Sequence, residues 1–330
     1  MKEILNLLYD HKKLTKEQSR KILVDISQDK YNPSQVASFI SVYLMRGISV
    51  DELDGFKSAL LELCIPVDLE GQETIDVCGT GGDGKNTFNI STTSAFVVAG
   101  AGYKVSKHGN YGVSSVCGSS NVLEHLGYQF TNDISKLKTQ LDQSNICFFH
   151  APLFHPALKS VGPIRKQLGV KTFFNLLGPL VNPARPTHQL VGVFNLKIMR
   201  LYQFLYENST INYSILHALD GYDEVSLTGK VKVAQREKEM LFTPQDVNLP
   251  QYNPEAIFGG DDVPAAGKIF VDILNGKGTA AQNDVVSINA ALAIQTFKPA
   301  QSIADCLAEA NESIVSGKAK TSFEKLISLS

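Results

Sequence analysis

The 330-residue sequence is long enough for a large domain with a smaller one, and its 43% hydrophobic and 19% charged residues are typical of a folded globular chain. A net charge of −2 gives no electrostatic reason to bind nucleic acid or an anionic membrane, so neither partner is expected. The five cysteines form no CxxC pair, which disfavours a disulfide framework or a zinc site. With no secretory signal and no apolar run of membrane-spanning length, we expect a cytoplasmic location.

The first 65 or so residues are predicted to form short helices. Their starts carry capping signatures: Thr15 with Gln18, Asn32 before Pro33, and Ser49 with Glu52. A unit this small cannot bury all its apolar faces alone, so it should pack on the rest of the chain, on a second subunit, or on both. We predict a helical domain over 1–70. A further helix at 155–168 packs either with these helices or with the sheet, and we expect the segment near 155–185 to join the helical domain.

The pattern changes from Thr74 onward, where strands alternate with helices. Strands are predicted at 74–78, 103–106, 146–149, 189–194 and 214–218, and helices at 91–99, 121–126, 264–274 and 285–293, with a final helical pair near the C-terminus. Such alternation predicts an α/β domain over 71–330, with a mostly parallel central sheet flanked by helices.

A glycine-rich loop follows the first of these strands, with the sequence GTGGDG at 79–84. Glycines let backbone N–H groups approach a phosphate, and the helix that begins near Ser91 can hold an anion at its N-terminus. No Gly-Lys-Ser/Thr follows at P-loop spacing, and the loop is not a GxGxxG dinucleotide fingerprint. Phosphate binding and a plain strand-to-helix turn are the two interpretations of this loop taken alone.

A second loop of similar type is predicted at 107–115, with the sequence KHGNYGVSS. Lys107 offers a positive charge and the serines offer hydroxyl donors, a set that suits a pyrophosphate. Two such loops from one sheet are more specific than one, because both would converge beyond the carboxyl ends of the strands. Farther on, Asp223 and Glu224 follow a predicted strand. Adjacent carboxylates of this kind suit Mg²⁺, but a solvated acidic turn would have the same sequence pattern.

Together these motifs closely resemble the anthranilate phosphoribosyltransferase family over almost the whole chain. The segments His155-Pro156, GPIR at 162–165 and FNLLGPLVNP at 174–183 resemble further stretches of it. The resemblance implies transfer of the phosphoribosyl group of 5-phosphoribosyl-1-pyrophosphate to the amine of anthranilate, the second step of tryptophan biosynthesis from chorismate. It also implies Mg²⁺, with two ions expected, and a homodimer formed through the helical domain.

The resemblance carries residue roles with it. Contacts to phosphoribosyl pyrophosphate are implied for Gly79, Gly82, Asp83, Thr87, Asn89, Ile90, Ser91, Thr92, Lys107, His108, Gly109, Asn110, Tyr111, Gly112, Val113, Ser114, Ser115 and Ser119. Contacts to anthranilate are implied for Gly79, Asn110, Arg165, His155 and Pro179. The implied metal ligands are Ser91, Asp223 and Glu224, and the candidate general base is His108.

Two positions depart from the family pattern. Tyr111 stands where many members have arginine after KHGN, and Cys117 stands where serine is usual. Both departures bear on substrate affinity, because a hydroxyl replaces a charge at one position and a thiol, a poor hydrogen-bond partner, stands at the other.

Two other interpretations compete with the transferase. A pyrimidine nucleoside phosphorylase resembles this family in fold and in its KHGN-like loop. It uses phosphate and no magnesium-bound pyrophosphate, and it carries an extra C-terminal region, so the Asp223–Glu224 pair and the short chain argue against it. A non-catalytic, nucleic-acid-binding relative is the third interpretation, and the net charge of −2 weighs against it.

Overall fold

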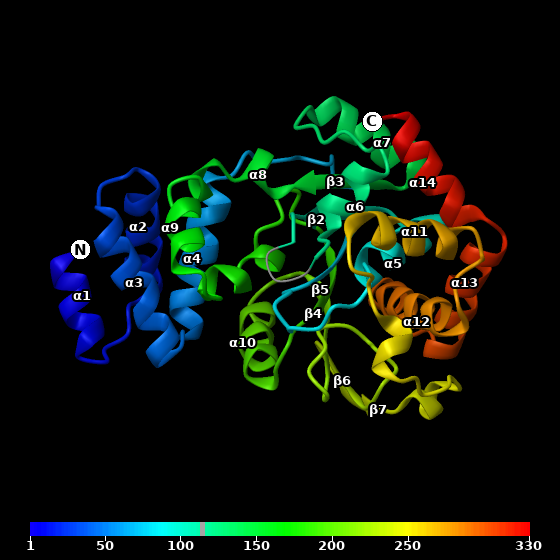
Figure 1. Ribbon diagram of the computed structural model, residues 1–330. Coiled ribbons are helices and arrows are strands. Elements are labelled where there is room, and N and C mark those ends of the chain that lie inside the picture. The colour runs from blue at the N-terminus through cyan, green and yellow to red at the C-terminus, as the bar shows by residue number, and fades with distance from the viewer. Residues whose placement is uncertain (113–115) are drawn as a thin grey trace. The chain divides into compact units, whose positions relative to one another are not determined.

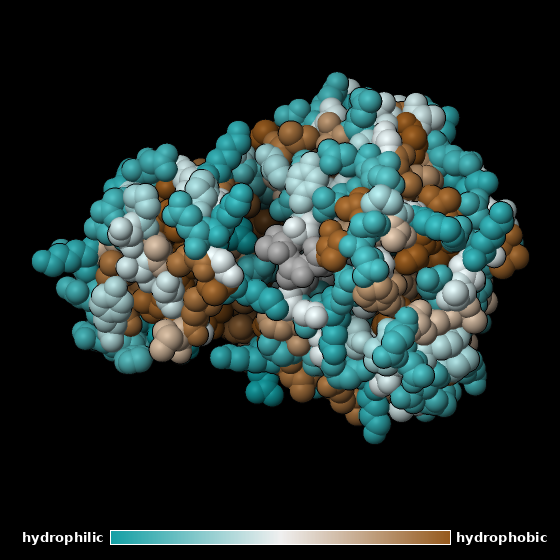
Figure 2. All heavy atoms as spheres, viewed as in Figure 1, coloured by the Kyte–Doolittle hydropathy of each residue, from teal (hydrophilic) through white to brown (hydrophobic). Residues whose placement is uncertain are grey.

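The computed structural model describes residues 1–112 and 116–330, and the chain divides into two compact units (Figure 1). Unit 1 comprises 1–67 and 151–185, and unit 2 comprises 68–150 and 186–330. Within the described residues, no helix combines the length and the apolar character needed to cross a membrane. Hydrophilic residues cover much of the visible face of each unit, interrupted by hydrophobic patches (Figure 2).

Unit 1 is helical. Its elements are α1 (Lys2–Tyr9), α2 (Lys16–Ser27), α3 (Pro33–Arg46), α4 (Val50–Leu63), α8 (Ala151–Phe154), η1 (Pro156–Leu158), α9 (Gly162–Leu168), η2 (Phe173–Leu176) and η3 (Gly178–Leu180). All three predicted helix starts are confirmed: Thr15 and Ser49 form capping boxes, and the Asn32 side chain accepts from the Gln35 N–H ahead of Pro33.

An aromatic cluster explains why 151–185 joins the N-terminal helices. Phe39 and Tyr43 of α3 and Phe56 of α4 pack on Phe173 of η2, with Phe56 and Phe173 stacked 4.6 Å apart. Phe173 thus completes an aromatic core with the N-terminal helices. The segment 155–168, for which the sequence left two packing partners open, also lies in unit 1.

Unit 2 contains a seven-stranded sheet in the order β3-β2-β1-β4-β5-β6-β7. Its strands are β1 (Ile75–Gly79), β2 (Val105–Gly109), β3 (Ile146–His150), β4 (His188–Gly192), β5 (Asn212–Ala218), β6 (Val231–Gln235) and β7 (Glu239–Phe242). The first five strands are parallel, and β6 and β7 add antiparallel pairs at one edge. The mostly parallel sheet is thus confirmed, while the antiparallel edge was not predicted from the sequence.

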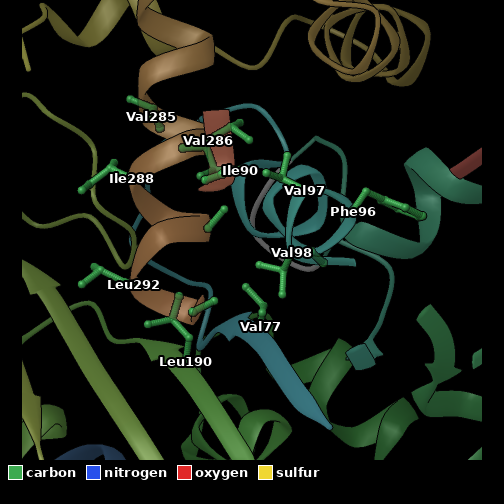
Figure 3. Close-up of a cluster of buried hydrophobic side chains, with 14 of the residues drawn as sticks. Val77, Ile90, Phe96, Val97, Val98, Leu190, Val285, Val286, Ile288 and Leu292 are labelled. Carbon is green, nitrogen blue, oxygen red and sulfur yellow. The ribbon is translucent and has the colours of Figure 1, made fainter. Parts of the chain in front are cut away.

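Helices cover this sheet. They are α5 (Ile90–Gly100), α6 (Ser119–His125), α7 (Ile134–Ser144), α10 (Leu196–Glu207), α11 (Val263–Leu274), α12 (Ala280–Phe297), α13 (Ile303–Val315) and α14 (Lys318–Ser328), with short turns η4 (Pro244–Val247) and η5 (Pro254–Ile257). The core lies where α5 and α12 meet the sheet: Figure 3 shows Val97 and Val98 of α5 gathered with Val77 of β1, Leu190 of β4 and Leu292 of α12.

Two predictions of element bounds were wrong. The helix predicted at 155–168 is interrupted: η1 is followed by the separate helix α9, which has a proline in its first turn, where a helix tolerates it. The second error concerns β2. Lys107 and His108 were expected in a loop, but β2 continues to Gly109, because Lys107 pairs with Phe148 and His108 with Phe149 of β3. Both side chains are buried as a result. The polar residues at the end of β2 did not indicate a strand, because β3, with which they pair, lies about 40 residues further on in the sequence.

Candidate active site

The site-forming loops leave the sheet where its strand order reverses. The chain goes from β1 outward to β2 on one side and from β4 outward to β5 on the other, so β1 and β4 are neighbours at a topological switch point. Right-handed crossovers then send the connecting helices to opposite faces, which leaves a crevice beyond the carboxyl ends of these two strands. Figure 1 shows α5 and α10 on either side of β4. This crevice is where an open α/β sheet binds its ligand.

The glycine-rich loop is tied down at both ends. The Thr80 N–H donates to the Gly192 carbonyl oxygen at the end of β4, at 2.8 Å, and Gly81 adopts a φ of 64° that favours glycine. The Lys85 N–H donates to the Asp83 carboxylate at 2.9 Å, which closes a tight turn. These contacts hold both ends of the loop in place.

A segment that the sequence did not single out supports this loop from outside. The Gly259 N–H donates to the Asn86 carbonyl at 2.8 Å, and the Asn86 side chain donates to the Gly260 carbonyl at 3.0 Å. Thr87 forms an isolated antiparallel bridge with Phe258. A Cβ on Gly259 would lie 2.4 Å from the Thr87 carbonyl oxygen, so this contact requires a glycine.

The acidic pair meets the first loop directly. The Asp223 carboxylate accepts from the Gly81 N–H at 2.6 Å, and the Glu224 carboxylate accepts from the Ser91 N–H at 3.0 Å. Ser91 lies in the first turn of α5, where the helix dipole favours negative charge. Ser91 thus lies next to the Asp223–Glu224 pair, although about 130 positions of sequence separate them.

Burial makes this cluster electrostatically costly. Burial and the nearby charge of Asp83 raise the pKa of Asp223 to about 7. Burial, followed by the charges of Asp223 and Asp83, raises the pKa of Glu224 well above its usual value, and burial also raises the pKa of Asp83. Carboxylates crowded in this way favour either protons or a cation.

The donor set fits Mg²⁺ in one respect and is incomplete in another. Carboxylate and hydroxyl oxygens are the ligands Mg²⁺ prefers, and raised carboxylate pKa values indicate a place that a cation would stabilise. Among the described residues, however, no three or more His, Cys, Asp or Glu side chains are arranged as a ready metal site. This is the expected pattern for Mg²⁺, which is usually held by one or two carboxylates together with substrate phosphates.

Two glycines allow the acidic segment to lie on the sheet. A Cβ on Gly79 would lie 2.4 Å from the Asp223 carboxylate oxygen, and a Cβ on Gly192 would lie 1.4 Å from the Asp223 carbonyl oxygen. Gly192 was not identified from the sequence as a site residue. The only local sign of it is a glycine at the carboxyl end of a predicted strand, which is a place of close backbone approach.

Asn289 of α12 was also missed. Its side chain accepts from the Val225 N–H at 3.1 Å and donates to the Val225 carbonyl at 2.9 Å, and it is 3% exposed. Because Val225 follows Glu224, Asn289 fixes the backbone that carries the acidic pair. A lone asparagine on an apolar helix gives a weak signal in the sequence, since many such residues simply satisfy their own helix.

The start of the second loop is anchored to β1. The His108 N–H donates to the fully buried Asp76 carboxylate at 3.2 Å, and the Lys107 ammonium group donates to the Val77 carbonyl at 2.5 Å. Burial lowers the pKa of Lys107, opposed by the charges of Asp76, Cys78 and Glu224. The positive charge of Lys107 therefore lies beneath the loops, on the side of the acidic cluster, and is not directed toward solvent.

Two asparagines hold the rest of the second loop. The Asn121 side chain accepts from the N–H groups of Gly112 and Gly118, at 2.9 and 3.0 Å. The Asn89 side chain donates to the Cys117 carbonyl at 3.0 Å and so joins the two loops. This bond uses the main chain of Cys117, so a thiol in place of a serine hydroxyl leaves it intact. Val113, Ser114 and Ser115, which the resemblance assigns to substrate binding, lie outside the described residues.

The implied substrate residues of unit 2 differ in what they can offer. Ile90 is fully buried and Thr92 is 1% exposed, so their backbones are better placed than their side chains to meet a ligand. Asn110 is exposed. The Ser119 hydroxyl group accepts from the Asn110 N–H and donates to the Asn110 carbonyl oxygen, each at 3.3 Å. The structure brings together the following implied residues at this edge of the sheet: Gly79, Gly82, Asp83, Asn89, Ser91, Lys107, His108, Gly109, Asn110, Gly112, Ser119, Asp223 and Glu224.

The remaining implied anthranilate residues belong to unit 1. The Arg165 guanidinium of α9 lies 5.1 Å from the ring centre of Phe174, and burial lowers its pKa. Among the described residues, no carboxylate forms an ion pair with Arg165. His155 is 2% exposed, and burial lowers its pKa to about 4, so its imidazole is neutral near pH 7; Pro179 is buried in η3.

Comparisons with known proteins agree along the whole chain. Residues 71–320 match the family described as glycosyl transferase family, a/b domain, and residues 2–64 match glycosyl transferase family, helical bundle domain. The chain is 55% identical to anthranilate phosphoribosyltransferase of Flavobacterium psychrophilum, over all of both chains.

Solved structures give the same result. The crystal structure of anthranilate phosphoribosyltransferase from Thermus thermophilus aligns with a TM-score of 0.91 at 29% identity, covering 98% of each chain. The Saccharomyces cerevisiae enzyme in complex with phosphoribosyl pyrophosphate and Mg aligns with a TM-score of 0.89 at 27% identity, covering 96% of this chain and 93% of that one. The same yeast enzyme in complex with 4-fluoroanthranilate aligns with a TM-score of 0.85 at 26% identity, with the same coverage.

Proposed function

The chain belongs to the anthranilate phosphoribosyltransferase family, and from this premise we infer which of its residues carry the reaction. The enzyme transfers the phosphoribosyl group of 5-phosphoribosyl-1-pyrophosphate to the amine of anthranilate, which gives N-(5-phosphoribosyl)anthranilate and pyrophosphate. This is a step of tryptophan biosynthesis.

The observation that carries the residue assignment is the contact between the acidic pair and the first loop. Asp223 accepts from the Gly81 N–H and Glu224 from the Ser91 N–H, at the switch point of the sheet. A nucleoside phosphorylase, which uses free phosphate and no metal-bound pyrophosphate, has no need for buried carboxylates next to its phosphate loop. The arrangement therefore favours the transferase over the phosphorylase.

The chemical difficulty lies in the leaving group. Displacement of pyrophosphate from the ribose C1 concentrates negative charge on the departing oxygens, and fixed N–H and hydroxyl donors stabilise that charge without reorganising. The first loop and the start of α5 supply such donors from Gly82, Thr87 and Ser91. The second loop supplies others from the backbone around Asn110 and from Ser119.

The anthranilate amine is neutral near pH 7, so it attacks without prior deprotonation, and positioning provides much of the acceleration. A proton must leave the amine after the new C–N bond forms. We assign its acceptance to His108, which β2 holds next to the second loop. Arg165 is the proposed partner of the anthranilate carboxylate, because a guanidinium group can pair with a carboxylate through two parallel hydrogen bonds.

Ser91, Asp223 and Glu224 are the proposed Mg²⁺ ligands, with two ions expected. When bound, Mg²⁺ supplies positive charge that neutralises the pyrophosphate and the crowded carboxylates. The relatives that support this proposal include the yeast enzyme solved with phosphoribosyl pyrophosphate and Mg.

A homodimer formed through the helices of unit 1 and a cytoplasmic location complete the proposal. Unit 1 exposes large apolar side chains that a second subunit would cover: Met45 is 90% exposed, Tyr9 56% and Leu44 46%. All five cysteines lie within the described residues and none is disulfide-bonded there, as a reducing compartment requires. Light scattering coupled to gel filtration tests the dimer.

The loss of anthranilate fluorescence after addition of phosphoribosyl pyrophosphate, with and without Mg²⁺, tests the function and its residue assignment together. We expect a loss that requires both additions. Asp223→Asn combined with Glu224→Gln should abolish most of it, because the neutral pair no longer attracts a cation. Full activity of this double variant would refute the metal-ligand assignment, and absence of turnover in the native protein would refute the function.

A further inference from the structure

Tyr111, in the second loop, directs its side chain onto the body of unit 2. Its hydroxyl group donates to the Glu124 carboxylate of α6 at 3.2 Å. Its ring meets the His150 ring edge-on, with 4.8 Å between the ring centres. The side chain thus links the loop that follows β2 to a helix and to the carboxyl end of β3.

The surface that receives Tyr111 is itself well packed. His150 is 5% exposed, its Nδ1 atom is 2.8 Å from the Ser120 hydroxyl oxygen, and its ring stacks on Phe130 at 4.4 Å. Burial lowers the pKa of His150, which keeps the ring neutral near pH 7 and suited to an aromatic contact. The His150 ring, held by Ser120 and Phe130, therefore offers Tyr111 a defined docking position.

Tyr111 also takes part in a network of backbone hydrogen bonds. Its N–H donates to the Asn110 side-chain oxygen at 2.8 Å, and the next residue, Gly112, donates to Asn121 at 2.9 Å. The Asn110 carbonyl accepts from the Ser120 N–H at 3.1 Å. Side chains of α6 therefore hold the backbone on either side of Tyr111, through Ser119 and Asn121. The Tyr111–Glu124 hydrogen bond adds the contact that the side chain of this segment itself makes to α6.

We propose that Tyr111 is a positioning residue: through Glu124 and His150 it preorganises the Asn110–Gly112 backbone for pyrophosphate, in place of a direct side-chain contact to the substrate. The proposal rests on the assignment of the second loop to phosphoribosyl pyrophosphate. A loop already held in its binding shape loses less conformational entropy when ligand binds, so the tie improves affinity without touching the ligand. Position 111 here provides order where an arginine would provide charge.

In the alternative, the Tyr111 hydroxyl group contacts the pyrophosphate directly. A substitution of Glu124 distinguishes this alternative from the positioning role. If Glu124 holds Tyr111 in place, Glu124→Ala weakens substrate binding. If Tyr111 contacts the pyrophosphate directly, Glu124→Ala removes a negative charge near an anion and strengthens binding instead. The sign of one substitution therefore decides between them.

The test compares Tyr111→Phe, Glu124→Ala, Glu124→Gln and the Tyr111→Phe/Glu124→Ala double variant. We expect Tyr111→Phe and Glu124→Ala each to raise the KM for phosphoribosyl pyrophosphate about fivefold, the double variant to match the single ones, and kcat and the KM for anthranilate to change less than about twofold. Glu124→Gln keeps the acceptor oxygen and should behave like the native protein. The dissociation constant of magnesium pyrophosphate, measured by calorimetry, should rise in parallel with the KM.

Tyr103→Phe is the matched control, because the Tyr103 hydroxyl donates to Glu309 at 2.7 Å away from the second loop. It should leave the KM for phosphoribosyl pyrophosphate unchanged. A lower KM in Glu124→Ala, or effects of Tyr111→Phe and Glu124→Ala that multiply in the double variant, would overturn the proposal.

Hydrogen exchange separates this proposal from the site assignment on which it rests. Slower exchange of 107–112 in the native protein on addition of phosphoribosyl pyrophosphate supports the assignment, and unchanged exchange overturns assignment and proposal together. If the native segment is protected but Tyr111→Phe exchanges no faster in the free protein and binds no more weakly, the positioning role alone fails.

Discussion

Gly192→Ala should impair activity much more than it impairs folding, because it disturbs the close packing of the acidic segment against the sheet. A Cβ at this position would lie 1.4 Å from the Asp223 carbonyl oxygen, whereas real Cβ contacts are essentially never shorter than 3.0 Å, so the two groups must separate by at least about 1.6 Å. Gly192 pairs with Gly79 of β1 and Leu216 of β5, which holds it inside the sheet. The acidic segment, not the strand, therefore has to move.

The size of this movement sets the expected effect. A displacement of about 1 Å in a positioned catalytic group can cost about 100-fold in rate, so we expect kcat/KM to fall by about 100-fold or more. Overpacking usually costs about 1–3 kcal/mol, which is less than the stability of a typical domain, so the variant should still fold. Activity should thus be lost from a folded protein.

Gly100→Ala is the control. Its Cβ would lie 2.4 Å from the Ala319 backbone nitrogen and from the Ser313 hydroxyl oxygen, a clash at the end of α5 about 14 Å along the helix from Ser91. It should lower the melting temperature and leave kcat/KM nearly unchanged. Steady-state anthranilate fluorescence and thermal unfolding measure both variants. A folded Gly192→Ala protein with kcat/KM within about threefold of the native value would refute the reasoning.

Three further predictions concern single side chains. Asn289→Leu leaves both backbone groups of Val225 without their partner, so the Mg²⁺ concentration for half-maximal activity should rise about tenfold, and an unchanged Mg²⁺ titration would contradict a positioning role for Asn289. Arg165→Lys loses the planar pair of donors, so the KM for anthranilate should rise about tenfold with the KM for phosphoribosyl pyrophosphate unchanged; equal changes in both would argue against a carboxylate contact. His155 has a pKa of about 4 in the folded protein against 6.5 in the unfolded chain, so the unfolded state binds the extra proton first and stability falls as the pH drops through this window. Between pH 7 and pH 5, the unfolding free energy of the native protein should therefore fall by about 2 kcal/mol more than that of His155→Leu. Denaturant titration at both pH values measures this, and equal falls in the two proteins would contradict the lowered pKa of His155.

Local features were the ones that the sequence determined reliably. The caps at Thr15, Asn32 and Ser49 involve residues three positions apart, and the glycine-rich loop follows its strand without interruption. Hydrophobic periodicity predicted the helices around α5 and α12 and the parallel strands, because each pattern is written within one short segment. Motif order and spacing over the whole chain added the family.

The contacts that turn these motifs into a site depend on residues far apart in the chain. Nothing near Gly192 indicates that Asp223 lies against it, and nothing near Asn289 indicates that it holds Val225. Lys107 looked like an exposed loop cation, yet β2 buries it beneath the acidic cluster. Likewise, the segment near 155–185 was expected to join the helical domain, but the pairing of Phe173 with Phe39 and Phe56 came only from the structure. Sequence patterns encode which face of an element is apolar, but the element that covers that face is chosen by packing and strand order, so only the tertiary structure decided how the site is assembled.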